Sequence, residues 1–380
     1  MKNIVSISLV ITLFAFLTSC EKKSQKPEEI KSIVLEPQIH DNGYDSRPTL
    51  ADEFTDIEII SLENRNECLL SHVRKMIVTD SAMIFFSRNP IEKTISFSLN
   101  GQYRNCFGDK GNAKGEYRNV QNVATSFSGD TIVMIDIPDI KLYDSDGKYL
   151  SSLPIKNTIG AEDIFLTDKG AFLGYFHRQE TGIMSFYDKS FKNKKDIIKT
   201  PVNPFGYTWG SGNLNFIQKD RNTILCLDGL TTSFYAFDIN SPEDVTRYSF
   251  HLDGVLTEEE ARKNMGTEEV ELFIVYSFLI YNGMVRGVIL KSGECYDFKF
   301  SLSGKTVELI HHKDFDYSFD YCHSGFFYKI VTAEELLDFM DESKRYMEPI
   351  RELLGNSLSN LKGKISPTDN HYVIKMRLKE

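Results

Sequence analysis

The stretch Tyr143-Asp144-Ser145-Asp146-Gly147 decides the fold, because its pattern recurs along the chain. An aromatic residue ends a strand-like run, a polar or glycine turn follows, and another strand-like run begins. The other copies are Phe97-Ser98-Leu99-Asn100-Gly101, Tyr187-Asp188-Lys189-Ser190, Phe237-Asp238-Ile239-Asn240 and Phe300-Ser301-Leu302-Ser303-Gly304. Successive copies in chain order begin 46, 44, 50 and 63 residues apart. A repeat of roughly 40 to 50 residues in a strand-rich chain predicts the blades of a β-propeller.

The segments between these turns are short runs of β-branched and aromatic residues, such as 75–78, 83–86 and 131–135. We therefore expect an all-β fold over residues 51–380: a six-bladed β-propeller of four-stranded antiparallel blades, with five and seven blades as alternatives. The aromatic of each unit is expected to pack between blades, since a single blade cannot cover both of its faces. A strand near 57–62 is expected to pair with C-terminal strands, the last over 371–376, which removes exposed edges and closes the ring.

Small helical insertions are expected near the C terminus. Thr257 followed by Glu260, and Thr332 followed by Glu335, each match a capping box, in which the two side chains satisfy free amides at a helix start. The second box opens a helical stretch to about Leu354. Its apolar positions predict a helix docked on the propeller rim, with a partner-binding helix as the alternative.

The N-terminal region predicts export. A basic start precedes an apolar run over 4–17, which is too short to span a bilayer and is typical of a signal-peptide core. The following Leu17-Thr18-Ser19-Cys20 resembles the bacterial lipobox, which implies a signal peptide over 1–19 and lipid attachment at Cys20; an ordinary secretory signal is the alternative. Residues 20–50 are polar and are expected to form a flexible tether. Glu21-Lys22-Lys23-Ser24 leaves the periplasmic and surface faces of the membrane both open.

Charge and cysteine usage exclude several classes of protein. The chain has 44 basic and 54 acidic residues, a net charge of −10, so nucleic acid is not an expected partner. Five cysteines remain after Cys20, an odd number without Cys-x-x-Cys spacing, which argues against zinc and thioredoxin-type sites. Among these, Cys226 lies in an apolar run and is expected to be a buried small hydrophobe.

A glycine-rich loop follows the first repeat unit. In Phe107-Gly108-Asp109-Lys110-Gly111-Asn112-Ala113-Lys114-Gly115-Glu116-Tyr117, the positions Gly108, Gly111, Gly115, Glu116 and Tyr117 resemble the loop motif of six-bladed β-propeller lipoproteins of Gram-negative bacteria, relatives of NHL-type propellers. Ala113 and Lys114 depart from the glycine and proline of that motif. The resemblance implies the architecture and an envelope location, and no activity. A phosphate cradle is the alternative reading, but a helix should then follow, and a strand-like run follows instead.

Two segments carry candidate ligand-binding residues. The segment 311–323 holds Asp314 and Asp316, which we expect near the axial channel or one mouth of the ring, either in ligand contact or in hydrogen-bonded structural roles. Tyr207 and Trp209 lie in a glycine-rich loop and could stack on a sugar or peptide, with burial against the next blade as the alternative. Asp144 to Gly147 matches only the start of a calcium loop and is expected to be a hairpin turn.

The combined prediction is a lipid-anchored cell-envelope protein, at the outer membrane, whose propeller binds a protein, small molecule or glycan without catalysis. Catalysis is not expected because no pairing of a nucleophile with a base stands out, and no cofactor or metal is expected. The alternative is a metal-assisted lyase or hydrolase at the channel mouth, with residues drawn from Asp314, Asp316, His311, His312 and His323. A further alternative is a sensor or structural partner of another envelope complex. The fold by itself does not choose among these functions.

Overall fold

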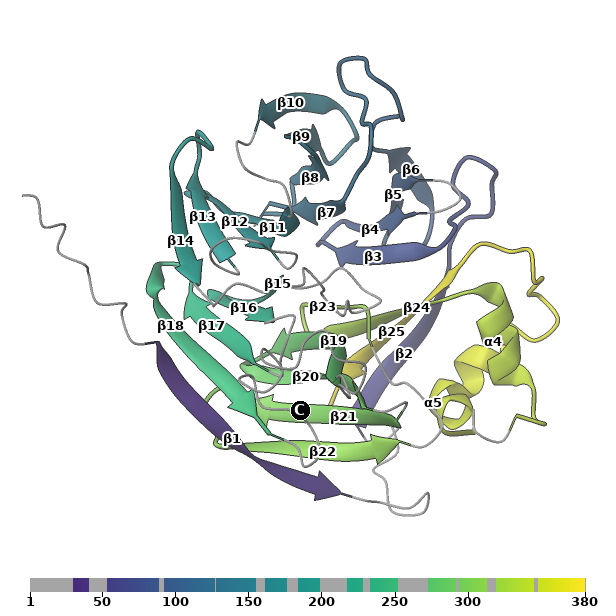
Figure 1. Cartoon of the computed structure of the whole chain (residues 1–380). Coiled ribbons are helices and arrows are strands. Elements are labelled where there is room, and N and C mark those ends of the chain that lie inside the picture. Colours follow the sequence, from purple (N-terminus) through teal and green to yellow (C-terminus); the bar gives the residue numbers. More distant parts are fainter. Residues whose placement is uncertain are drawn as a thin grey trace, which may run out of the picture. The chain divides into compact units, whose positions relative to one another are not determined.

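The computed structural model describes residues 30–40, 53–88, 92–126, 128–154, 161–175, 184–198, 217–227, 233–251, 273–291, 294–312, 319–344 and 348–379. The chain divides into two compact units, 1–31 and 32–380, and the description below concerns the second. Apart from β1 (Lys31–His40), its described strands form six sets of four, which we call blades 1 to 6 (Figure 1). The prediction of an all-β propeller with four-stranded antiparallel blades is confirmed.

The blades follow one another along the chain. Blade 1 contains β3 (Val73–Val78), β4 (Ala82–Ser87), β5 (Lys93–Ser98) and β6 (Tyr103–Cys106), and blade 2 contains β7 (Asn122–Thr125), β8 (Thr131–Asp136), β9 (Asp139–Asp144) and β10 (Tyr149–Pro154). Blade 3 contains β11 (Ala161–Leu166), β12 (Gly170–Tyr175), β13 (Met184–Asp188) and β14 (Lys194–Ile198), and blade 4 contains β15 (Ile217–Asp220), β16 (Thr223–Leu227), β17 (Phe234–Asp238) and β18 (Ser241–Phe250). Blade 5 contains β19 (Phe273–Tyr281), β20 (Met284–Lys291), β21 (Glu294–Ser301) and β22 (Thr306–His312), and blade 6 contains β23 (Tyr321–His323), β24 (Phe326–Val331), β25 (Tyr372–Leu378) and β2 (Phe54–Ser61).

The ring is closed by strands from the two ends of the propeller. As predicted, the N-terminal β2 pairs antiparallel with the C-terminal β25, with Ile59 opposite Ile374. The first strand of each blade also contacts the first strands of both neighbouring blades, in the cycle β3, β7, β11, β15, β19, β23 and back to β3. These six strands are the innermost ones, and they surround the axis of the propeller (Figure 1).

The repeated aromatics pack between blades, as predicted. Those of the five repeat units are all at least 97% buried: Phe97, Tyr143, Tyr187, Phe237 and Phe300. The ring centroids of Phe237 in blade 4 and Phe172 in blade 3 lie 5.3 Å apart. Those of Phe300 in blade 5 and Phe234 in blade 4 lie 5.6 Å apart. The repeat therefore encodes both the hairpin turn and the packing between blades.

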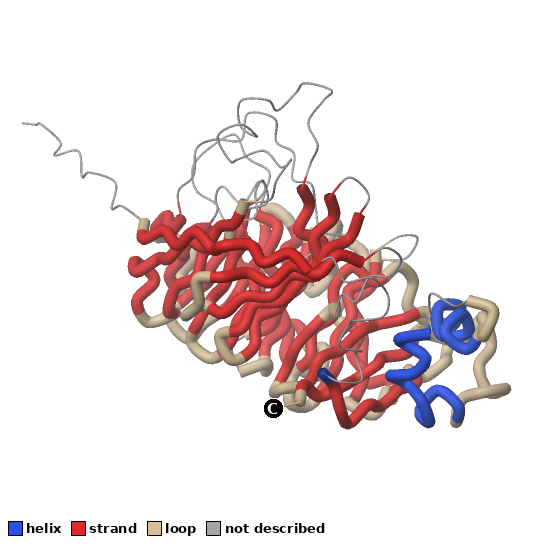
Figure 2. The backbone as a smooth tube through the Cα atoms, turned by 90° about the horizontal axis from the view of Figure 1, so that it is seen from below, coloured by secondary structure: helices blue, strands red, loops and turns tan. Residues whose placement is uncertain are grey.

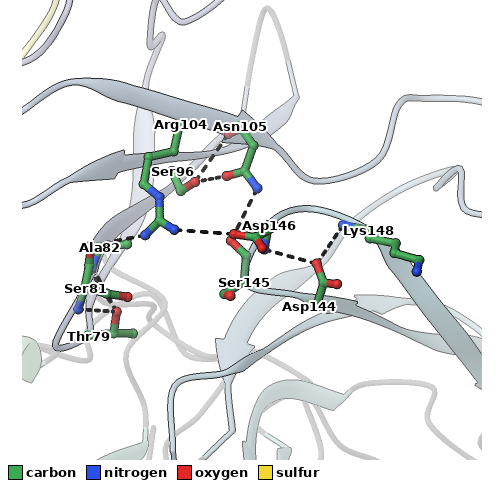
Figure 3. A network of polar contacts seen from close by, with 10 residues as sticks. All are labelled: Thr79, Ser81, Ala82, Ser96, Arg104, Asn105, Asp144, Ser145, Asp146 and Lys148. Atoms are coloured by element: carbon green, nitrogen blue, oxygen red, sulfur yellow. Dashed lines mark hydrogen bonds and ion pairs between the residues drawn. The ribbon is translucent and has the colours of Figure 1, made fainter.

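Hairpin turns add polar contacts between neighbouring blades (Figure 3). The Asp144 carboxylate accepts hydrogen bonds from the amides of Asp146 and Lys148, at 3.0 and 2.9 Å, which confirms the predicted turn. From blade 1, Arg104 donates to the Ser81 carbonyl at 3.1 Å and pairs with Asp146 at 3.5 Å. The Asp144 to Gly147 turn is thus both a hairpin and a contact between blades 1 and 2.

The segment expected to be a flexible tether contains a strand, β1 (Lys31–His40). This strand lies between the outermost strands of blades 4 and 5 and is parallel to β22, so that it joins the two blades into one nine-stranded sheet. The expectation of a spacer without structure is wrong here, because pairing with two sheet edges stabilises the segment. Its side chains are exposed except for Leu35, which is 1% exposed, and the half-buried Ile33.

Two helices, α4 (Ala333–Met340) and α5 (Glu348–Ser359), lie between β24 and β25 and form a compact group beside the strands (Figure 2). The predicted capping box is present at Thr332 and Glu335. Leu336, Phe339 and Leu353 pack into one core cluster with strand residues of blade 6, which confirms a helix docked on the propeller. The predicted single stretch is instead two helices, because α4 ends at the C-cap Asp341. The other predicted box, at Thr257, lies outside the described residues.

Candidate functional site: the axial cavity

A cavity of about 440 Å³ lies where the innermost strands of all six blades converge. Its lining includes the C-terminal parts of these strands and the turns that follow them. The lining residues are Lys75, Ile77, Val78, Thr79, Asp80, Ala124, Thr125, Ser126, Ser128, Gly129, Asp163, Ile164, Phe165, Ile217, Gln218, Lys219, Asp220, Arg221, Ile280, Tyr281, Asn282, Tyr321, Cys322, His323 and Ser324. Each blade therefore contributes to one shared site.

A buried carboxylate in the lining connects four blades. Asp163 on β11, 1% exposed, accepts a hydrogen bond from the Lys75 ammonium of blade 1 at 2.8 Å. It also accepts from the Asn122 amide of blade 2 at 3.2 Å and from the Ile217 backbone amide of blade 4 at 3.0 Å. Burial raises the pKa of Asp163, whereas Lys75 and the backbone amides act in the opposite direction. This carboxylate crosslinks blades 1 to 4 at the axis.

Two uncharged polar side chains of the lining are available to a ligand. Gln218 is 8% exposed, and its side-chain amide forms no hydrogen bond within the described part of the chain. The Tyr321 hydroxyl of blade 6 likewise forms none with a described residue, and burial raises its pKa, so that it keeps its proton at neutral pH. The pair offers an amide and a hydroxyl, both of which can donate and accept hydrogen bonds.

Charged and polar groups toward the ends of the strands make contacts with one another. The His323 Nε2 lies 2.8 Å from the Asp80 carboxylate. The Arg221 guanidinium donates to the Asn282 carbonyl oxygen at 3.0 Å, and the Gly283 amide donates to the Asp220 carboxylate at 2.7 Å. Asp80, Asp220 and Arg221 therefore each have a hydrogen-bond partner within the described part of the chain.

Burial shifts the pKa values of one lysine and one cysteine in the lining. Burial lowers the pKa of Lys219 to about 8, and its ammonium lies 5.9 Å from the centroid of the Phe165 ring. Burial raises the pKa of the Cys322 thiol to about 12, which makes this cysteine unreactive at neutral pH. All five cysteines from Cys68 to Cys322 are free thiols, and Cys226 is fully buried, as predicted.

The glycine-rich loop connects blade 1 to blade 2 and is held by its own contacts. Gly108 and Gly115 have positive φ angles of 64° and 85°, the conformation that favours glycine. The Glu116 carboxylate accepts from the Ala113 amide at 2.7 Å, and the Gly111 amide donates to the Tyr117 carbonyl at 2.9 Å. Because these loop amides are engaged in turns, the loop has the features of an interblade connection, as expected.

Several candidate residues cannot be placed. Cys20, Tyr207, Trp209, Asp314 and Asp316 lie outside the described residues, as does the segment 313–318 between β22 and β23. His311 and His323 are not brought together. The first stacks on Tyr296 with ring centroids 4.7 Å apart in the outer part of blade 5, and the second lies at the cavity. Over the described ranges, no group of three or more His, Cys, Asp or Glu residues is arranged to hold a metal ion.

Apart from His323, the residues that line the cavity are not marked by any pattern identified in the sequence. Lys75 and Asp163 each lie within a short strand, where a charged residue is usually read as part of a solvated face. Their common position in the first strand of a blade is the signal that could have identified them, because first strands face the axis.

The fold and this cavity define a β-propeller protein with an axial site. The chain belongs to the family described as "Domain of unknown function (DUF4934)", whose model matches residues 36–377. The match covers all six blades and the second half of β1. No curated protein matches the chain significantly.

Two solved structures have a similar fold. A candidate exported protein from Bacteroides fragilis has a TM-score of 0.70 and 14% identity, with 92% of this chain and 100% of that chain covered. A member of the DUF4221 family from Bacteroides vulgatus has a TM-score of 0.54 and 11% identity, covering 86% and 98% of the two chains. At these identities the similarity concerns the fold. Within the described ranges, no helix is long and apolar enough to cross a membrane.

Proposed function

We propose that this protein is a non-catalytic binding module that takes a small, polar, uncharged ligand in its axial cavity. The observation that carries the proposal is the convergence of six strands on one space of about 440 Å³, within the range of small-molecule sites. A rigid ring presents the lining groups in fixed positions, which lowers the entropy cost of binding.

The lining chemistry supports an uncharged polar ligand such as a glycan or peptide fragment. Lys75 and Asp163 satisfy each other, so neither is free to neutralise a charged ligand. Gln218 and Tyr321 offer hydrogen bonds, while Ile77, Ile164 and Phe165 supply apolar surface. The lining as a whole is more polar than apolar, which suits a ligand that forms several hydrogen bonds.

The ligand proposal is tested by thermal unfolding with a panel of neutral mono- and disaccharides and short uncharged peptides. A saturable rise in melting temperature is expected for one class. Each of the changes Gln218→Ala and Tyr321→Phe should weaken that binding about five- to tenfold, the effect of one lost hydrogen bond. The control Gln102→Ala alters an exposed turn residue. If no probe gives a saturable shift, or if the lining variants bind like the control, the proposal is wrong.

We also propose that the module is tethered to the cell envelope, at the outer membrane, through lipid on Cys20. The lipobox-like Leu17-Thr18-Ser19-Cys20 and the preceding apolar run support this. Two or more acyl chains would give a stable anchor. Metabolic labelling with a fatty-acid analogue should mark the wild type and not Cys20→Ser, and membrane fractionation should find the variant released. Equal labelling of both proteins would refute the anchor without affecting the ligand proposal.

A further inference from the structure

Two arginines at the same end of the β3 and β4 pair in blade 1 have no acceptor among the described residues. Arg74 is the bulge residue of β3, between Val73 and Lys75. Arg88 directly follows β4, and its backbone amide donates to the His72 carbonyl at 3.0 Å, so both arginines belong to the same end of this strand pair. Within the described ranges, neither guanidinium forms a hydrogen bond or an ion pair, and the Nε of Arg74 is buried.

This arrangement has an electrostatic cost. Burial and the positive charge of Arg88 both lower the pKa of Arg74, and no carboxylate opposes them. Arg74 is half-buried, and a charge that loses part of its hydration without gaining a partner is left uncompensated. Four other arginines of this chain, by contrast, lie beside a carboxylate: Arg65 with Glu63, Arg104 with Asp146, Arg286 with Glu53 and Arg377 with Asp56.

The position of the two arginines separates them from the ligand groups of the axial cavity. The lining from this part of blade 1 consists of Lys75 and of Ile77 to Asp80, and it includes neither Arg74 nor Arg88. Arg74 lies near the start of β3, toward the opposite end of the strand. The chain also carries a net charge of −10, which disfavours a diffuse attraction of anions. Any anion held here must therefore be held by local contacts.

We propose that Arg74 and Arg88 form a binding site for an oxyanion group of a small molecule, a carboxylate, phosphate or sulfate. Guanidinium groups present planar, paired donors that match the oxygens of these groups, and two such groups side by side can bind one anion from two directions. Arg74 and Arg88 are both half-exposed, so an anion would bind the outer N–H groups of the two guanidiniums. This site is additional to the proposed uncharged ligand of the axial cavity and does not depend on it.

The test uses the full-length protein with sodium sulfate, sodium phosphate and sodium acetate, each compared with sodium chloride at equal ionic strength. Thermal unfolding and calorimetric titration should show saturable binding of at least one oxyanion. Saturation matters because sulfate and phosphate also stabilise proteins nonspecifically. A response to acetate alone would assign a carboxylate, and a response to sulfate and phosphate would assign a tetrahedral oxyanion.

Both Arg74→Gln and Arg88→Gln should raise the apparent Kd for that anion at least tenfold. Without anion, Arg74→Gln should melt no lower than the wild type, because it removes an unpaired charge. The matched control Arg104→Gln, also in blade 1 but paired with Asp146, should keep the wild-type response (Figure 3). If Arg74→Gln does not fold, Arg88→Gln decides. Wild-type binding in both variants, or no saturable binding of any of the three anions, would overturn the proposal.

Discussion

Replacing Asp163 with asparagine is expected to lower the free energy of unfolding by about 3–5 kcal/mol, the usual effect of removing one partner of a buried ion pair. The change leaves the Lys75 ammonium charged and only 6% exposed, with no carboxylate at its former distance of 2.8 Å. The asparagine NH2 also replaces an oxygen that now accepts from backbone or side-chain N–H groups. Since whole domains are stable by about 5–15 kcal/mol, the effect should be large.

The measurement is urea unfolding followed by circular dichroism, with the slope m compared between variants. A double variant, Lys75→Met with Asp163→Leu, separates the lost ion pair from lost packing. It should be more stable than Asp163→Asn alone, because it leaves no buried unpaired charge. The reasoning is refuted if Asp163→Asn costs less than about 1 kcal/mol, or if the double variant is the less stable of the two.

Three further predictions concern the strand β1, a buried histidine and a lining lysine. Leu35→Ala should cost about 2–5 kcal/mol in urea unfolding, because Leu35 is the one fully buried side chain of β1. Burial lowers the pKa of His371 below 6.5, so the unfolded chain binds a proton at this residue more tightly than the folded protein does. The free energy of unfolding should therefore fall as the pH drops below 6.5, and His371→Asn should make this fall smaller. Lys219 should titrate near pH 8 in NMR of the reductively methylated protein.

Each of these predictions has its own control. Val34→Ala, at a β1 position that is 70% exposed, should change stability by less than about 0.5 kcal/mol, and an effect equal to that of Leu35→Ala would contradict the assigned burial. An unchanged acid dependence in His371→Asn would show that other groups cause it. The Lys219 signal is assigned by its loss in Lys219→Gln, and a titration above about pH 10, near the ordinary value for lysine, would contradict the burial of this side chain.

Local signals in the sequence predicted much of the fold. The turn at Asp144 to Gly147 and the capping box at Thr332 are satisfied by side chains within four residues, so they can be read without knowing the rest of the molecule. The repeated aromatics identified the blade spacing, because each must be covered by the next blade. Ring closure by β2 and β25 was also predictable, since an open ring would leave two exposed edges.

The residues of the candidate site were harder to predict from the sequence than the fold. Residues in the glycine-rich loop were recognised because their spacing is local. In contrast, the polar groups of the cavity come from six strands, and Lys75 is 88 residues from Asp163. No local pattern marks such a pair, because each residue alone resembles an ordinary charged position on a strand.

The sequence by itself determined the class of fold, the turns, the helix start and the blade repeat, since these depend on neighbours along the chain. Only the tertiary structure determined that residues 31–40 form the strand β1 and that Lys75 and Asp163 form an ion pair near the axis. Nearly all of β1 is exposed, so it lacks the alternating pattern of a strand, and its order comes from the distant edges of β18 and β22. The same holds for two charged residues: Asp163 is paired with Lys75, whereas Arg74 has no ion pair among the described residues. Which charge is paired depends on the residues that the closed ring places next to it.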